Sequence, residues 1–243
     1  MDPHSANKSA AAAQIEAGPF GAWLSQARAS LLGNRGADVP CGDCVGCCVS
    51  SYYIPLRPED KAAFDRIPEK HFISTSSGQL MLGYRQDGLC PMLTAGQCSI
   101  YAHRPQTCRD YDCRIFAAAG IEAGGSDKAV INSRVAQWRF TYEAEADRLA
   151  HKAVQSAAAF IAHKRDSFPG TRVPTAPTGI AVLAIKTYRV FLDTGLLARS
   201  DTEIACALID ASREFDAGPT AMQGDDLVAA VESHQTQTVC SPP

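Results

Sequence analysis

Eight cysteines lie close together in the chain, and their density constrains the fold more than any other feature. The chain has 243 residues and ten cysteines, eight of them between residues 41 and 113. Such a density indicates disulfides in a secreted chain, and metal binding or redox chemistry in a reducing compartment. The first twenty residues hold no basic segment followed by an apolar run, so we expect no signal peptide and a cytoplasmic location. Metal chelation is therefore the leading interpretation, with disulfides or redox switching and unliganded buried thiols as the alternatives.

Composition and charge exclude some other classes of protein. A hydrophobic content of 46% and a charged content of 20% are typical of a globular chain that is large enough to bury a core. A formal net charge of -3 provides no field that would attract nucleic acid or an anionic membrane. No segment reaches the roughly 18 uninterrupted apolar residues that cross a bilayer. We expect no nucleic acid and no membrane as partners, and the sequence leaves an unknown protein partner open.

The spacing of the cysteines favours a shared centre. The first four form the run C-G-D-C-V-G-C-C, in which thiols two residues apart can curl around one centre. Adjacent side chains diverge along most backbones, so Cys47 and Cys48 serve two different centres or only one of them is a ligand. The later cysteines lack knuckle spacing and must complete sites that the first four begin. The candidate metal ligands are Cys41, Cys44, Cys47, Cys48, Cys90, Cys98, Cys108 and Cys113. Eight thiolates suit two four-ligand centres, or one cluster with spare ligands.

These motifs resemble the YkgJ-type CxxCxxCC family of zinc- or iron-chelating domains, whose pattern is CxxCxxCC followed by a C-x-Leu element, CxIY and RPxxCR. The later elements stand here as Cys90-Pro-Met-Leu93, Cys98-Ser-Ile-Tyr101 and Arg104-Pro-Gln-Thr-Cys108-Arg109. The resemblance covers roughly residues 38 to 117, and Cys113 lies just past the core motif. It implies metal chelation, often as iron–sulfur, without an established general activity.

All-thiolate ligands suit both zinc and iron–sulfur clusters. The run CxxCxxC is close to the ferredoxin run C-x₂-C-x₂-C-x₃-C-P, whereas zinc sites commonly come from two separated CxxC knuckles. An iron–sulfur cluster is therefore the favoured cofactor, with zinc as the alternative. Arg104 and Arg109 flank Cys108, and their positive charge would offset the negative charge of a cluster. Salt bridges to Asp110 or Asp112 are the alternative role of these arginines.

Catalytic motifs are missing from the sequence. We find no nucleophile elbow, phosphate-binding loop, HExxH or dinucleotide fingerprint, so no catalytic residue is predicted and enzymatic activity stays open. Three hypotheses follow. The first is a structural metal centre, with function in the helical part. The second is an iron–sulfur redox enzyme or electron carrier, and the third is a thiol redox sensor.

The chain divides into four parts by composition. We expect a flexible N-terminal arm at 1–18, a cysteine-cluster module with a leading helix at 19–120, a helical region at 121–217 and a polar tail at 218–243. The predicted fold is α+β and mostly helical, with a loop-rich cysteine-cluster module packed against a C-terminal helical bundle.

Apolar periodicity and turn signals place the main elements. Helical spacing runs from Phe20 to Leu32, and again from Ile131 to Phe160, where it predicts one long amphipathic helix. A further helix covers 180–192, and a last helix opens with a capping box at Ser200. Short strands are predicted at 52–56 and 79–84, with a short helix at 58–64.

Overall fold

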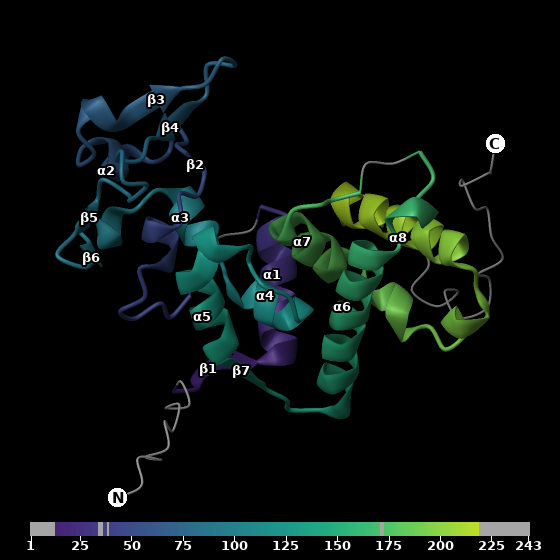
Figure 1. Cartoon of the computed structure of the whole chain (residues 1–243). Helices are drawn as coiled ribbons and strands as arrows, with labels where there is room; N and C mark the ends of the chain where they lie inside the picture. The colour runs from purple at the N-terminus through teal and green to yellow at the C-terminus, as the bar shows by residue number, and fades with distance from the viewer. Residues whose placement is uncertain (1–12, 34–35, 38, 171–172, 219–243) are drawn as a thin grey trace, which may run out of the picture.

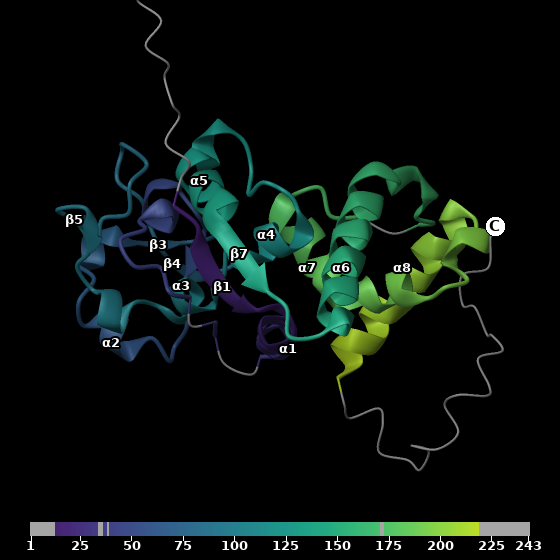
Figure 2. The same cartoon turned by 90° about the horizontal axis from the view of Figure 1, so that it is seen from below.

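The computed structural model describes residues 13–33, 36–37, 39–170 and 173–218 (Figure 1). Helices dominate and the sheets are small, which confirms the mostly helical α+β class. Figures 1 and 2 show the cysteine module as a lobe beside a bundle of helices. Most of the predicted arm and nearly all of the predicted tail, with Cys240, lie outside the described residues.

The bundle contains the leading helix and four later ones. They are α1 (Phe20–Leu31), α4 (Arg114–Ala119), α6 (Glu145–His163), α7 (Pro177–Thr187) and α8 (Asp201–Ala217). Their apolar faces meet in one large core, in which Phe20, Phe116 and Ile161 are fully buried. The capping box is confirmed, because the Ser200 hydroxyl accepts from the Glu203 amide and the Glu203 carboxylate accepts from the Ser200 amide. None of the described helices is long and apolar enough to cross a membrane.

The cysteine lobe is built from short elements around a second, smaller core. A three-stranded antiparallel sheet has the order β2-β4-β3, and a hairpin pairs β5 with β6. The elements are β2 (Ile54–Pro55), α2 (Lys61–Phe64), β3 (Phe72–Ser74), β4 (Leu80–Leu82), β5 (Leu93–Thr94), β6 (Gln97–Cys98) and α3 (Gln106–Asp110). The predicted strands at 52–56 and 79–84 and the helix at 58–64 are present with shorter bounds. The small core includes Ile54, Leu82, Met92 and Ile100.

The prediction of one helix from Ile131 to Phe160 is wrong. Helix α5 (Ala129–Gln137) ends at a strand, β7 (Trp138–Thr141), before α6 begins. Strand β7 pairs in parallel with β1 (Ile15–Pro19), so residues 15–18 form a strand instead of the end of a flexible arm. Trp138 fits the helical period, but Trp138 and Phe140 are aromatic residues, which also favour strands, and a partner strand more than a hundred residues away decides between the two.

A buried ion pair ties the N-terminal elements to the start of α4. Asp112 accepts from the Nε of Arg114 at 2.9 Å and from the indole nitrogen of Trp23 at 2.9 Å. Arg114 also donates to the carbonyl of Ala17 in β1 at 3.2 Å. Both charged side chains are less than a tenth exposed. The network therefore fixes α1 and β1 around Cys113, the residue between the two charges.

We predict that Asp112→Ala lowers the free energy of unfolding of the metal-free protein by about 3–5 kcal/mol, because it leaves Arg114 buried without its counter-charge. Urea denaturation followed by circular dichroism measures this loss. The matched control is Asp110→Ala, since Asp110 pairs with Arg57 at the surface, and we expect a loss of about 1 kcal/mol or less. Equal losses for the two variants would contradict the role of the buried pair.

Candidate metal centre

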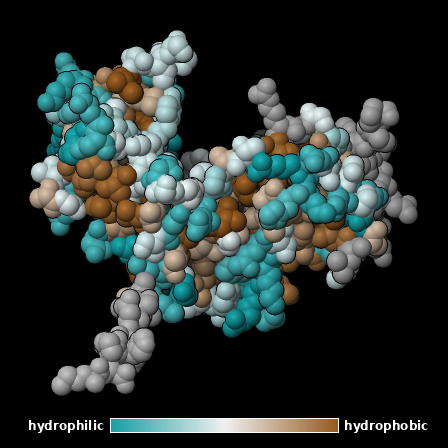
Figure 3. Space-filling view, in the orientation of Figure 1, coloured by the Kyte–Doolittle hydropathy of each residue, from teal (hydrophilic) through white to brown (hydrophobic). Residues whose placement is uncertain are grey.

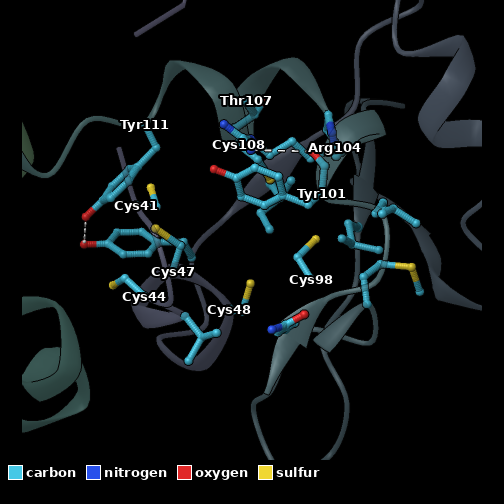
Figure 4. Close-up of a pocket in the computed structure, with 18 of the residues that line it drawn as sticks. Cys41, Cys44, Cys47, Cys48, Cys98, Tyr101, Arg104, Thr107, Cys108 and Tyr111 are labelled. Carbon is cyan, nitrogen blue, oxygen red and sulfur yellow. Dashed lines mark hydrogen bonds between the residues drawn. The ribbon is translucent and has the colours of Figure 1, made fainter. Parts of the chain in front are cut away.

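The cysteine thiols surround a cavity of about 420 Å³ in the cysteine lobe (Figure 4). Six of the eight cysteines line it, together with Tyr52, Tyr101, Arg104 and Tyr111. Cys90 and Cys113 lie behind the wall and are buried. Figure 3 shows hydrophobic residues gathered on the face of this lobe. All eight candidate ligands of the sequence therefore lie in one region as free thiols.

A first set of thiols adjoins the large core. Cys41 and Cys113 pack against that core. The charges that act most strongly on the Cys47 thiol are those of Cys113, Cys41 and Cys44, in that order. A backbone hydrogen bond of 3.0 Å from the Cys44 amide to the Cys41 carbonyl closes the first turn of the run. We name Cys41, Cys44, Cys47 and Cys113 the first set.

A second set belongs to the small core. Cys48, Cys90, Cys98 and Cys108 all pack in or against it. Cys90 and Cys98 are the neighbours that act most strongly on the pKa of the Cys48 thiol, and the same two cysteines act on the pKa of Cys108. The Cys90 amide also donates to the Cys48 carbonyl at 2.7 Å, which joins the two loops. We name these four residues the second set.

The two sets meet at one short 3-10 turn, Gly46–Val49, which carries both Cys47 and Cys48. Neighbouring side chains of such a turn leave the backbone in different directions, so consecutive cysteines enter different sets (Figure 4). The turn packs closely on α5, because a Cβ atom at Gly46 would lie only 2.9 Å from the side chain of Ile131. Glycine is thus needed at this position for the close approach.

Two residues that the sequence did not mark as site residues also touch the thiols. The indole nitrogen of Trp138 donates to the Cys113 sulfur at 3.2 Å. Arg134 on α5 pairs with Asp43 at 2.9 Å and is hydrogen-bonded to the Cys44 thiol. Such donors stabilise thiolates and tune bound metal. No local pattern reveals them. Arg134 lies about ninety residues beyond the cysteine run that it contacts, and Trp138 lies well beyond Cys113 in the sequence.

The two predicted arginines have different surroundings. Arg104 lines the thiol cavity and lies over the Tyr101 ring at 4.0 Å. Arg109 donates to the backbone carbonyls of Ala102 at 2.6 Å and Arg104 at 3.2 Å, so it holds the loop that carries Arg104. The ion pairs of Asp110 and Asp112 are made with Arg57 and Arg114. Of the two predicted arginines, Arg104 is therefore the one whose charge lies at the thiol cavity.

Burial and hydrogen bonding change the acidity of the thiols in opposite directions. Burial raises the pKa of Cys108 and of Cys113 to about 12, and it raises the pKa of Cys47 as well. Hydrogen bonds to Cys90 and Cys98 raise the pKa of Cys48. The hydrogen bond from Cys48 lowers the pKa of Cys98 to about 6, with a smaller contribution from Arg104. Most of these thiols therefore hold their protons at neutral pH, and metal binding must release them.

The eight thiols are the right ligand type for a thiolate-bound metal, but their side chains are not yet oriented toward a common metal position. Four thiolates are the common ligands of structural zinc and of iron–sulfur clusters. In the described part of the chain, no group of three or more His, Cys, Asp or Glu side chains is already arranged to hold a metal ion. Ligation therefore requires the thiols to turn toward a common point in each set.

We predict that Cys98 is the thiol most reactive toward iodoacetamide at pH 7 in the chelator-treated protein. Its pKa of about 6 means that the thiolate dominates above that pH and is lost as the pH falls below it. Cys108, with a pKa of about 12, should stay unmodified. Mass spectrometry of tryptic peptides over a pH series measures both rates. A Cys98 rate that rises only above pH 8 would contradict the assignment.

Comparison with known proteins identifies the cysteine region. Residues 40–133 match the family model CxxCxxCC, described as a "putative zinc- or iron-chelating domain". No curated protein and no solved structure matches the chain. The matched segment contains all eight thiols of the two sets and the turn where they meet. The cysteine region of this chain is therefore similar to the domains that this family model describes.

Proposed function

We propose that this protein binds metal in two adjacent four-thiolate centres, and that each centre is an iron–sulfur cluster. The observation that carries the proposal is the division of the thiols between two cores: Cys41 and Cys113 pack on the large core, and all four thiols of the second set pack in or against the small core. The first centre would use Cys41, Cys44, Cys47 and Cys113. The second would use Cys48, Cys90, Cys98 and Cys108.

The pattern of the first set supports iron–sulfur over zinc. It combines a CxxCxxC run with one remote cysteine, Cys113. In two-cluster ferredoxins the fourth cysteine of such a run ligates the other cluster. Cys48, the fourth cysteine of the run here, likewise packs with the other set. The spacing differs, because Cys48 follows Cys47 directly.

Full coordination by protein favours a structural or electron-transfer role. Four thiolates per centre leave no position open for a substrate, which a catalytic metal requires. The two centres would also clip together loops that are distant in sequence, and metal binding of this kind contributes to folding free energy. Electron transfer suits two clusters whose ligands Cys47 and Cys48 are joined by one peptide bond.

Two observations favour the alternatives. Cys48 is the largest influence on the pKa of Cys98, and Cys90 and Cys98 are the largest influences on the pKa of Cys48; such a close group of thiols suits a single zinc ion, whose bonds to sulfur are about 2.3 Å long. The lowered pKa of Cys98 suits a thiol redox sensor in which this residue reacts after the metal is lost. The metal analysis described next separates zinc from iron–sulfur, and the iodoacetamide reactivity of Cys98 described above tests the sensor.

We predict that anaerobic purification yields a brown protein with two clusters per chain, measured as iron and acid-labile sulfide on the same sample. A colourless protein with two zinc ions per chain would support two centres but would show that zinc, and not an iron–sulfur cluster, occupies each of them. Removal of the metal by a chelator should lower the melting temperature, because the cysteine lobe has a small core and few regular elements. A protein free of both metals after anaerobic purification would overturn the proposal.

We predict that Cys113→Ser and Cys108→Ser each remove one centre and leave about half of the metal, since each centre loses one of four ligands. The double variant should lose nearly all of it. Cys240→Ser, at a cysteine outside the family domain, is the matched control and should keep the full content. Complete loss of metal from either single variant, with the fold retained, would show that the eight thiols form one centre instead of two.

A further inference from the structure

Tyr84 has a buried hydroxyl group that finds no hydrogen-bond partner among the described residues. The residue follows β4 and packs against the small core. Its hydroxyl oxygen is shielded from solvent and makes no hydrogen bond in the part of the chain that the structure describes. A buried hydroxyl is costly unless it is hydrogen-bonded, and an unpartnered one in a native structure points to a group that is not yet in place.

The backbone places Tyr84 near a cysteine of the second set. The Arg85 amide donates to the Leu89 carbonyl at 2.9 Å and the Gly88 amide to the Arg85 carbonyl at 2.9 Å, which closes a tight turn. Tyr84 and Cys90 directly flank this closed turn, so the backbone brings the two residues near each other. Gly88 adopts a positive φ of 77°, as such a turn requires.

The cysteine sulfurs of the second set can supply the hydrogen-bond acceptor that the Tyr84 hydroxyl lacks. The sulfurs whose charge acts most strongly on Tyr84 are those of Cys90, Cys108 and Cys48, all of the second set. Burial raises the pKa of the Tyr84 hydroxyl, so the group keeps its proton and acts as a donor. A thiolate that ligates a metal carries more negative charge than a thiol and accepts hydrogen bonds from such donors.

We propose that the Tyr84 hydroxyl donates a hydrogen bond to the Cys90 sulfur when the second centre holds its metal. Tyr84 is then a positioning residue, because it acts on the centre through a ligand. The inference rests on the proposed second centre. It also gives the second centre a donor that corresponds to Trp138, whose indole already donates to Cys113 of the first set.

The test uses the full-length chain, with Cys113→Ser present so that only the second centre binds. The protein is loaded anaerobically with Co²⁺, and the affinity is measured by competition with a chelator while the thiolate-to-Co²⁺ absorption is followed. Tyr84→Phe is expected to weaken Co²⁺ binding by about tenfold or more and to shift the charge-transfer band. The metal-free protein should be as stable with Phe as with Tyr or more stable, because the variant removes an unpartnered polar group.

Controls separate this inference from general damage and from failure of the proposed function. Tyr53→Phe removes a hydroxyl from the cavity wall on a side chain that is 59% exposed, and it should leave the affinity unchanged. An unchanged affinity and band for Tyr84→Phe would overturn the inference alone. A Tyr84→Phe variant that destabilises the metal-free protein as much as the loaded one would also overturn it, since Tyr84 would then serve packing only. Failure of the Cys113→Ser parent to bind Co²⁺ would instead overturn the second centre.

Discussion

The divergence of two consecutive side chains in the turn Gly46–Val49 is the constraint on which the cysteine domain depends. Because Cys47 and Cys48 leave this turn toward different sets, one peptide bond joins a set that adjoins the large core through Cys41 and Cys113 to a set that packs in the small core. Two hydrogen bonds and close packing hold this turn in place. The Ser50 hydroxyl donates to the Gly46 carbonyl at 2.6 Å, Lys128 donates to the Ser50 carbonyl, and the lack of a side chain at Gly46 lets α5 approach. Because the turn is held in place, the positions of the two sets of thiols relative to each other are fixed.

The same division explains why the chain needs its helical part. The second set lies in a small core of short strands and turns, which buries little apolar area and gains most from a metal. The first set instead adjoins the large core, where Cys113 lies between the charges of Asp112 and Arg114 and beside the indole of Trp138. Strand β7 brings that indole into place and depends in turn on β1. Residues from the start of the described chain and from its middle thus shape the surroundings of one cysteine.

Sequence reasoning succeeds here where the signal is local. The ligand candidates, the α1 helix and the capping box at Ser200 follow from residue spacing within a few positions, and the structure gathers or forms each of them. It fails at Trp138, because a helical period and a strand propensity coexist there and only the distant β1 decides between them. Tyr84 is also beyond local reasoning. Its importance lies in a hydroxyl that has no partner, and such a deficit is visible only once every neighbour has been placed.

Electrostatics gives a reason for the position of Arg104. Clusters ligated by eight thiolates would concentrate negative charge in a cavity of about 420 Å³, and charge of one sign in a partly buried space is costly unless it is offset. Burial raises the pKa of Cys41 and Cys108 overall, and the positive charge of Arg104 opposes that rise; it also contributes to the lowered pKa of Cys98. A single guanidinium, held by Arg109 through the loop backbone, therefore stabilises thiolates of both sets. Each of the two proposed centres would therefore gain from the same cation, so loss of the Arg104 charge would be felt at both.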